Sequence, residues 1–232
     1  MLTHTTNENQ FKMKHFFLIF SFCILILKSG ICQSSTYATY GWEMIFSLAD
    51  IEDQGREESS LLRWSPFFNF NTMLNADMSE HFGIFSGLAI RNVGYIYDNF
   101  QQDTVFYKKK FRSYNLGIPL GIKVGNLDNM YLYGGYEIEF PFHYKEKTIE
   151  DGDKINKTTG WFSKRQEAFQ HGFFVGLQFP HGANIKFKYY LSEFHNQEYE
   201  DASGNRPYAG LKTNIFYFSL NYVIRDTRFS EW

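Results

Sequence analysis

The clearest pattern in the chain is an alternation of apolar residues with small or polar ones between Arg112 and Val124. The even positions from Tyr114 onward carry aromatic or aliphatic side chains, and the odd positions carry serine, asparagine, glycine, proline or lysine. Successive side chains of a β-strand point to opposite faces, so a period of two indicates a strand with one apolar face. The segment from Met130 to Phe142 repeats the pattern.

The same alternation recurs along the chain and predicts eight strands. They lie at about 42–48, 68–74, 82–90, 112–124, 130–142, 173–179, 185–191 and 216–224. Three predicted connections are short (75–80, 125–129 and 180–184), and four are longer and polar (49–61, 94–104, 145–165 and 197–209). Short turns at one end and long loops at the other are typical of a membrane barrel. The predicted fold is all-β, an eight-stranded antiparallel up-and-down transmembrane β-barrel.

The two faces of the predicted strands indicate which face meets lipid. One face is apolar, and the other is rich in glycine and polar residues. Small and polar side chains suit the interior of a narrow barrel, so we expect the apolar face to point at lipid. The polar set, whose charges are expected to pair inside, is Glu43, Asn69, Asn71, Arg91, Ser113, Asn115, Lys123, Glu137, Glu139, Gln170, Lys186, Lys188, Ser192, Ser219 and Asn221.

Aromatic residues make up 20% of the chain, and many fall near predicted strand ends. We expect these residues to form the aromatic girdles that flank the lipid-facing band of membrane barrels, with a soluble aromatic core as the alternative. The set is Trp42, Trp64, Tyr95, Tyr97, Tyr144, Trp161, Tyr189, Tyr208 and Tyr222.

One long apolar run, from Phe16 to Leu27, follows a basic start near the N-terminus. Its 12 residues are too few to span a bilayer as a helix and have the length of the apolar part of a signal peptide. Small residues at positions 30 and 32 fit a cleavage before Gln33. We predict a signal peptide over residues 1–32, with an alternative start at Met13, and a single barrel domain over residues 33–232.

Both cysteines, Cys23 and Cys32, fall inside this predicted signal. The predicted mature chain is therefore exported without a disulfide framework, a thiolate nucleophile or a cysteine-based metal site. Ile31 is bulky where the signal of a lipoprotein usually has a small residue, so we do not expect acylation of Cys32, although the question stays open.

Three segments resemble small outer-membrane barrels of the PorT-like "outer membrane protein beta-barrel domain" family and their OmpX/OmpA-like relatives. The first is Tyr114–Lys123, with its Ile-Pro-Leu core, and the others are Tyr131–Tyr136 and Phe216–Tyr222. The resemblance covers roughly residues 36–224 and implies an integral outer-membrane protein, but no single activity. Members often end on an aromatic residue of the last strand, which the barrel assembly machinery recognises; here Tyr222 and Trp232 are both candidates.

The chain contains no nucleotide-binding loop, no His-Glu-x-x-His motif and no Gly-x-Ser-x-Gly elbow. Some eight-stranded barrels are lipid A deacylases, which carry a His-x-Ser pair on one strand. The closest counterpart here, Ser192 and His195, is three residues apart and would lie on opposite faces of a strand. We therefore predict no catalytic, cofactor-binding or metal-binding residues, no cofactor and no enzymatic activity.

Two groups of carboxylates are candidates for cation or acid–base sites. Glu137 and Glu139 share one strand face, and pairing with lysine or arginine across the interior is the expected role, because unpaired buried charges are costly. The acidic stretches over residues 50–58 and 198–201 are expected to be solvated loop segments. Residues 145–165 include Trp161 and Phe162, which we expect to anchor a loop base at the membrane interface.

The net charge of −2 gives no support for a nucleic-acid partner. The leading hypothesis is a non-enzymatic barrel with a lumen filled by side chains and a structural, surface or envelope-interaction role. It would lie in the cell outer membrane, with both termini periplasmic and the long loops extracellular. Its expected partners are outer-membrane lipids, the barrel assembly machinery and an envelope or surface protein. The alternatives are a lipid A deacylase-like enzyme and a secreted lipocalin-like carrier.

Overall fold

The computed structural model describes residues 35–102 and 105–226. The predicted signal peptide over residues 1–32, the alternative start at Met13, the acylation of Cys32 and the role of Trp232 in assembly lie outside the described residues and stay predictions. In the part that is described, no helix is long and apolar enough to cross a lipid bilayer.

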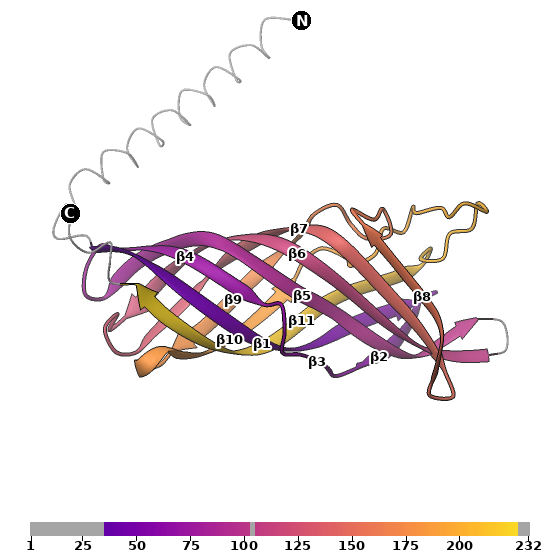
Figure 1. The fold of residues 1–232 in the computed structure, drawn as a ribbon, viewed down its shortest axis with the longest axis horizontal. Helices are drawn as coiled ribbons and strands as arrows, with labels where there is room; N and C mark the ends of the chain where they lie inside the picture. The colour runs from indigo at the N-terminus through magenta and orange to yellow at the C-terminus, as the bar shows by residue number, and fades with distance from the viewer. Residues whose placement is uncertain (1–34, 103–104, 227–232) are drawn as a thin grey trace, which may run out of the picture. The chain divides into compact units, whose positions relative to one another are not determined.

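Eleven strands and one short 3-10 turn form the described chain (Figure 1). In order they are β1 (Ser35–Asp53), β2 (Arg56–Leu61), β3 (Arg63–Ser65), β4 (Phe70–Asp77), β5 (Phe82–Gln102), β6 (Val105–Gly125), β7 (Tyr131–Glu150), β8 (Asp153–Trp161), β9 (Gln170–Gln178), η1 (Pro180–Gly182), β10 (Ala183–Tyr190) and β11 (Leu211–Asp226). β2, β3 and β4 share the second position of the sheet, and β8 and β9 share the sixth. The sheet therefore has eight positions, which confirms the predicted strand count.

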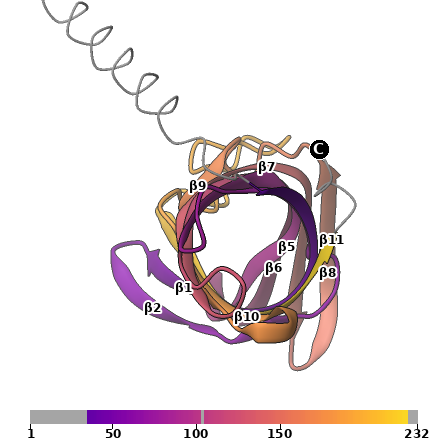
Figure 2. The same ribbon diagram turned by 90° about the vertical axis from the view of Figure 1, so that its left-hand side faces the viewer.

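The sheet closes into a ring because the first strand pairs with the last. β1 and β11 are antiparallel, in a register that runs from Ala38 opposite Asp226 to Asp53 opposite Leu211. Figure 2 looks along the axis and shows the closed ring, with β2 and β8 projecting outward from it. Closure removes the unpaired strand edges that an open sheet would expose. The antiparallel up-and-down barrel predicted from the alternation is confirmed.

The apolar face of the strands points outward. On β6, Leu116, Ile118, Leu120 and Ile122 are 40–65% exposed. The residues between them, from Gly117 to Gly121 at odd positions, are buried inside the ring. This orientation is the one expected from the polar second face, and it is the reverse of a lipocalin-like carrier, whose apolar side chains would line the interior.

Three of the four connections predicted as long polar loops are instead mostly strand. Residues 49–61, 94–104 and 145–165 fall largely within β1 and β2, β5 and β6, and β7 and β8. Two of these hairpins close in tight turns at Gln54-Gly55 and Asp151-Gly152, where both residues have positive φ angles of 49° to 92°. Such pairs of positive φ are what a two-residue hairpin turn requires. The acidic stretch over residues 50–58 is therefore a strand extension rather than a loop.

The barrel has two different ends. The turn end carries both ends of the described chain and the three short turns, because Ser35 pairs with Asp77 and Asp226 pairs with Ala38. The hairpin end carries the three strand extensions and the irregular connection over residues 191–210, referred to below as loop 191–210. The polar connection predicted at 197–209 lies within this loop.

Candidate functional site

The lumen is crossed at mid-height by six charged side chains from four strands. All are 0–6% exposed, and they balance three carboxylates against three cations. This ionic network consists of Glu43 of β1, Arg91 of β5, Glu137 and Glu139 of β7, and Lys186 and Lys188 of β10. Burying charges is costly unless each is paired and hydrogen-bonded, so the equal count of both signs is a condition for this interior to exist.

Each carboxylate of the network has at least two partners. Arg91 forms an ion pair with Glu43, and its Nε donates to Oε1 of Glu137 over 3.0 Å. Nζ of Lys188 lies 2.6 Å from both Glu137 and Glu139. Nζ of Lys186 lies 2.6 Å from Oε1 of Glu43. Glu137 and Glu139 thus pair with lysine and arginine across the interior, as the sequence indicated.

Neighbouring polar groups fill the remaining hydrogen-bonding capacity of the network. Nδ2 of Asn115 donates to Glu139 over 2.6 Å and to Gln170 over 2.8 Å. The hydroxyl of Tyr190 donates to Glu139 over 2.9 Å. A Cβ at Gly117 would stand 2.4 Å from Oε1 of Glu137, so glycine is the residue that leaves room for the glutamate there. The network therefore depends on a small residue of β6 as well as on its charges.

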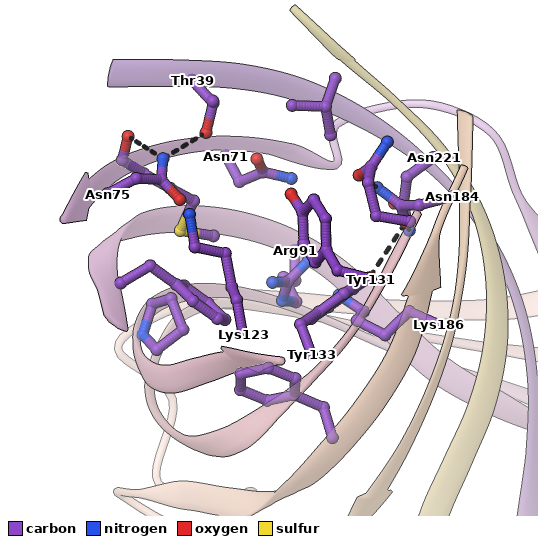
Figure 3. Close-up of a pocket in the computed structure, with 16 residues that line it drawn as sticks. Thr39, Asn71, Asn75, Arg91, Lys123, Tyr131, Tyr133, Asn184, Lys186 and Asn221 are labelled. Carbon is purple, nitrogen blue, oxygen red and sulfur yellow. Dashed lines mark hydrogen bonds between the residues drawn. The ribbon is translucent and has the colours of Figure 1, made fainter. Parts of the chain in front are cut away.

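Toward the turn end, the lumen contains a cavity of about 80 Å³ (Figure 3). Its lining includes three cations and five side-chain amides; the cations are Arg91, Lys123 and Lys186, of which Lys123 pairs with Asp77 and Lys186 with Glu43. Because one water molecule needs about 10–15 Å³ by this measure, the cavity holds a few water molecules and has no room for an acyl chain. This size does not suit a carrier of lipophilic ligands.

Toward the hairpin end, the lumen is closed by aromatic side chains. Tyr95 and Phe111 from the barrel wall pack against Phe194, His195 and Tyr208 from loop 191–210, all of them 0–1% exposed. The His195 ring stacks on the Tyr208 ring, with centroids 4.4 Å apart. His195 Nε2 lies 2.9 Å from the hydroxyl of Tyr95. The loop therefore folds back into the mouth and plugs it.

This plug corrects part of the aromatic-girdle prediction. Tyr95, Tyr97, Tyr144 and Tyr208 are 0–1% exposed and lie in the mouth of the lumen, not on the outer surface. Tyr95 and Tyr97 are at odd positions of β5, so they share the inward face with Arg91. The other members that are exposed, at 37–69%, are Trp42, Trp64, Trp161 and Tyr222.

An ion pair lies within the plug. Nζ of Lys109 is 3.2 Å from Glu146, and the hydroxyls of Tyr144 and Tyr208 donate to the same carboxylate over 3.0 and 2.7 Å. Burial alone would raise the pKa of Glu146, but Lys109 and the tyrosine hydrogen bonds outweigh it and hold the pKa below its ordinary value. Glu146 is therefore charged while the mouth is closed.

The pKa of His195 is lowered as well, and for a base a lowered pKa favours the neutral form. Burial lowers the pKa of His195 from 6.5 to about 3, and the nearby Lys109 adds to the shift, while Glu146 opposes it. The closed mouth thus holds a neutral histidine. In an open loop the same residue would return to its ordinary pKa and take up a proton near pH 6.5.

Acidification is expected to loosen loop 191–210. Below pH 6.5 the open loop binds a proton at His195 and the closed loop does not, so closure weakens by up to about 1.4 kcal/mol per pH unit until the pKa of about 3 is reached. Amide hydrogen exchange in the loop, compared at about pH 7.5 and about pH 4.5 after correction for the intrinsic rate, measures this change. The variant His195→Gln should lose most of the pH dependence. Equal protection of the parent at both pH values would contradict the expectation.

The structure does not bring Ser192 and His195 together as a catalytic pair. The Ser192 hydroxyl accepts a hydrogen bond from the backbone N–H of His171 over 3.0 Å and lines an outer cleft with Glu167 and Glu193. His195 lies inside the plug, bonded to Tyr95. Ser192, a member of the predicted lumen set, lies in loop 191–210 and not on a strand. No group of three or more His, Cys, Asp or Glu side chains in residues 35–102 and 105–226 is placed to hold a metal ion.

Sequence reasoning did not find the plug residues of loop 191–210. Phe194, His195 and Tyr208 follow no strand alternation, and only the fold brings them to Glu146 and Lys109. Lys109 and Phe111 lie before the predicted strand at 112–124, but both share the odd positions of β6 with Ser113 and Asn115, so an alternation extended toward the N-terminus would have placed them in the interior.

Comparisons with known proteins add a general likeness. No family model and no curated protein matches the sequence. Among solved structures, the chain is similar to Ail, the attachment invasion locus protein of Yersinia pestis, at 15% identity and a TM-score of 0.37, covering 83% of this chain and 100% of that one. It is similar to the Neisserial surface protein A at 9% identity and a TM-score of 0.35, covering 83% of this chain and 99% of that one. It is also similar to the outer membrane protein OprG from Pseudomonas aeruginosa, at 10% identity and a TM-score of 0.36, covering 82% of this chain and 96% of that one.

These solved structures are small outer-membrane or surface barrels. At such low identities and TM-scores the similarity carries no argument about the activity of this chain, and its fold rests on the strand pairing described above. Membership of the PorT-like family stays a prediction.

Proposed function

We propose that the protein is an integral outer-membrane β-barrel that neither catalyses a reaction nor conducts solutes, and that it acts through the surface at its hairpin end. The observation that carries the proposal is the band of apolar side chains around the outside of a barrel with a polar, charged interior. A water-soluble barrel would not expose such a band, because large exposed apolar patches are rare on soluble monomers.

The height of the band supports a membrane location. On β6 the outward apolar residues run from Leu116 to Val124, which is nine residues of strand. A tilted strand needs about 9–11 residues to cross the hydrocarbon core of a bilayer. Above this stretch, the outward positions of the same strand change to Arg112, Lys110 and Lys108. The change from aliphatic to cationic side chains marks one boundary of the band.

The orientation is inferred from the two ends. Outer-membrane barrels have short turns on the periplasmic side and longer segments on the extracellular side. The turn end would therefore face the periplasm, with both termini, and the hairpin end would face the outside. The PorT-like resemblance of Tyr114–Lys123 supports the same cellular location and a role in the envelope, with the barrel assembly machinery as the folding partner.

The filled lumen supports a role other than transport. The ionic network, the amides of Asn115 and Gln170 and the aromatic plug follow one another along the axis, all of them buried. An eight-stranded barrel is narrow enough for side chains to fill it. The separation of Ser192 from His195 gives no support for an acyl-transfer site.

Two measurements test this proposal together. The full-length protein should fractionate with outer membranes and run at a different gel mobility before and after boiling, and in planar bilayers it should give no stable conductance. Soluble recovery without a mobility shift would contradict the membrane barrel, whereas a large, stable conductance would contradict the closed lumen.

Single-cysteine labelling tests the orientation. The chain has only two cysteines, at positions 23 and 32, so a new thiol can be read without background once these are changed to serine. A membrane-impermeant maleimide applied to intact cells should label Ser203→Cys in loop 191–210. It should label Asn129→Cys, in a turn-end connection, only after the outer membrane is opened. The reverse pattern would invert the assignment of the two ends.

A further inference from the structure

Five cations from three adjacent strands line up on the outer surface at the hairpin end. This basic ridge consists of Lys110 and Arg112 of β6, Lys145 and Lys147 of β7, and Lys157 of β8. Figure 1 shows β7 and β8 running side by side beyond the barrel body at this end. The ridge gathers five charges of one sign at outward positions of neighbouring strands, and none of the five takes part in the ionic network of the lumen.

The strand register places these like charges directly opposite one another. Lys110 pairs with Lys147, and Arg112 pairs with Lys145. On the other side of β7, Lys147 pairs with Lys157. Like charges at directly opposed positions destabilise an antiparallel sheet. An arrangement that costs stability in the free protein points to a bound anion that offsets the cost.

A bulge in β7 is what turns its lysines outward. Tyr114 lies opposite His143, but the next residue of β6, Asn115, lies opposite Pro141, so Phe142 is the extra residue. The bulge changes the phase of the alternation, because two residues of one strand oppose one of the other. Beyond it Glu146 faces the lumen and pairs with Lys109, while Lys145 and Lys147 face outward.

No carboxylate whose side chain the structure describes forms an ion pair with the ridge. Three other basic side chains at the same end do form ion pairs: Lys108 with Asp98, Arg206 with Glu200 and Lys212 with Glu52. The pKa of Lys145 is lowered, first by burial and then by the neighbouring charges of Arg112, Lys157 and Lys147. A lowered pKa is what a lysine among other cations should show. The ridge is a set of cations that repel one another.

The ridge borders a groove. Lys110, Arg112, Lys145 and Lys147 line one side of a recess of about 200 Å³, and Arg63 and Trp64 of β3 line the other. Arg63 is held there by hydrogen bonds from its guanidinium to the backbone and side-chain oxygens of Asn92, at 3.2 and 2.6 Å. A recess with cations on both sides can surround a multivalent anion such as a phosphate group.

An aromatic cluster lies immediately below the ridge on the same strands. The Phe142 ring stacks on Trp161 with centroids 6.0 Å apart, and the His143 ring lies 4.7 Å from Trp161. Tyr114 contacts both Phe142 and His143, at 6.4 and 5.5 Å. Below Tyr114 the outward residues of β6 are Leu116 and the aliphatic residues that follow it. The order along the surface is thus cationic, aromatic and aliphatic.

We propose that the basic ridge binds the phosphate groups of an acylated lipid in the outer leaflet, with its acyl chains packed on the aliphatic surface below. A phosphate group carries negative charge and several oxygens that accept hydrogen bonds from lysine and arginine side chains. The aromatic cluster lies at the depth of the headgroup boundary. Apolar surface beneath the cations, first aromatic and then aliphatic, favours an amphiphile over a free anion. The inference rests on the proposed membrane location and on the hairpin end facing outward.

The test compares two charge-matched variants of the full-length barrel in neutral detergent micelles. The ridge variant carries Lys110→Gln, Arg112→Gln, Lys145→Gln and Lys147→Gln. The control variant carries Arg56→Gln, Lys108→Gln, Arg206→Gln and Lys212→Gln, which remove the same formal charge from the same end. Native mass spectrometry would count bound lipid A carrying two phosphates, against the same lipid without phosphates.

The parent should bind the phosphorylated lipid in preference to the phosphate-free one. The ridge variant should bind it at least about ten-fold more weakly, and the control variant should change by less than about two-fold, because each ridge cation near an anionic headgroup contributes separately. Equal losses in both variants, or equal binding of the phosphate-free lipid, would overturn the proposal. Displacement of the lipid by inorganic phosphate at equal phosphate concentration would also overturn it, in favour of a free-anion site.

Two accompanying measurements separate failure of this inference from failure of the proposed function. All three proteins should keep the heat-dependent mobility shift; without that shift in the parent, the membrane barrel itself is wrong. With the shift present and lipid binding insensitive to the ridge, only the lipid site is wrong. In lipid-free neutral detergent the ridge variant should be at least as stable as the parent, because its like-charge pairs are gone.

Discussion

Replacement of Arg91 by leucine is expected to destabilise the barrel by about 3–5 kcal/mol, the cost of removing one partner from a buried ion pair. Arg91 is 1% exposed and contacts Glu43, Glu137 and Glu139. Its loss leaves these three carboxylates with only two lysines in a lumen that excludes bulk water. The variant therefore buries one uncompensated negative charge. Urea unfolding in phospholipid vesicles, followed by the heat-dependent gel shift, measures the change in free energy.

A second substitution tests whether charge balance is the cause. In Arg91→Leu/Glu137→Gln the remaining carboxylates match the remaining cations, with Glu43 beside Lys186 and Glu139 beside Lys188. The double variant should recover part of the lost stability. Lys212→Gln breaks an exposed ion pair with Glu52 and serves as the control, with little expected change. A double variant less stable than Arg91→Leu alone would show that packing, rather than charge, dominates at this position.

The substitution Leu120→Arg should cost about 2–4 kcal/mol in a lipid bilayer, because a cation on the lipid face near the midplane cannot be hydrated. Leu120 is 65% exposed and is the middle outward residue of the stretch from Leu116 to Val124. The same urea titration in vesicles measures the loss.

Ile155→Arg is the matched control for Leu120. Ile155 is 52% exposed on β8, in the extension beyond the apolar band. We expect little change there, since water already surrounds the residue. Equal effects at the two positions would argue against a lipid-facing band. A Leu120→Arg protein that is stable and soluble without detergent would show that the apolar surface meets water.

The strict period of two explains why the sequence predicts the barrel so well. Along β6, apolar residues repeatedly fall on one face and small or polar residues on the other, and both faces have the orientation that the closed ring requires. The ionic network follows from the same argument, because Arg91, Glu137 and Lys188 all fall on the polar face. Their exact partners do not follow, since these depend on the register between strands that are far apart in the sequence.

The hairpin end was predicted less well, for reasons that differ between residues. Polar composition suggested loops at 49–61 and 145–165, although Gln54-Gly55 and Asp151-Gly152 carry the composition of tight hairpin turns. Tyr95 and Tyr97 share their parity with Arg91, so alternation could have placed them inside. His195 and Tyr208 had no such signal, because an irregular loop places them. The bulge at Phe142, which reverses the faces of Lys145 and Glu146, leaves no clear mark in the sequence either.

The seam between β1 and β11 also sets the order of events in folding. Its partners, such as Ala38 and Asp226, are separated by almost the whole described chain, and contacts of such long range form slowly. Until the last strand is available, the edge of β1 opposite β2, β3 and β4 stays unpaired, and the open sheet would expose apolar side chains to water. For the proposed outer-membrane location, the export route must therefore hold the emerging chain unfolded and shielded from aggregation until its final segment arrives. A ring closed in this way is not expected to have a stable, partly folded intermediate.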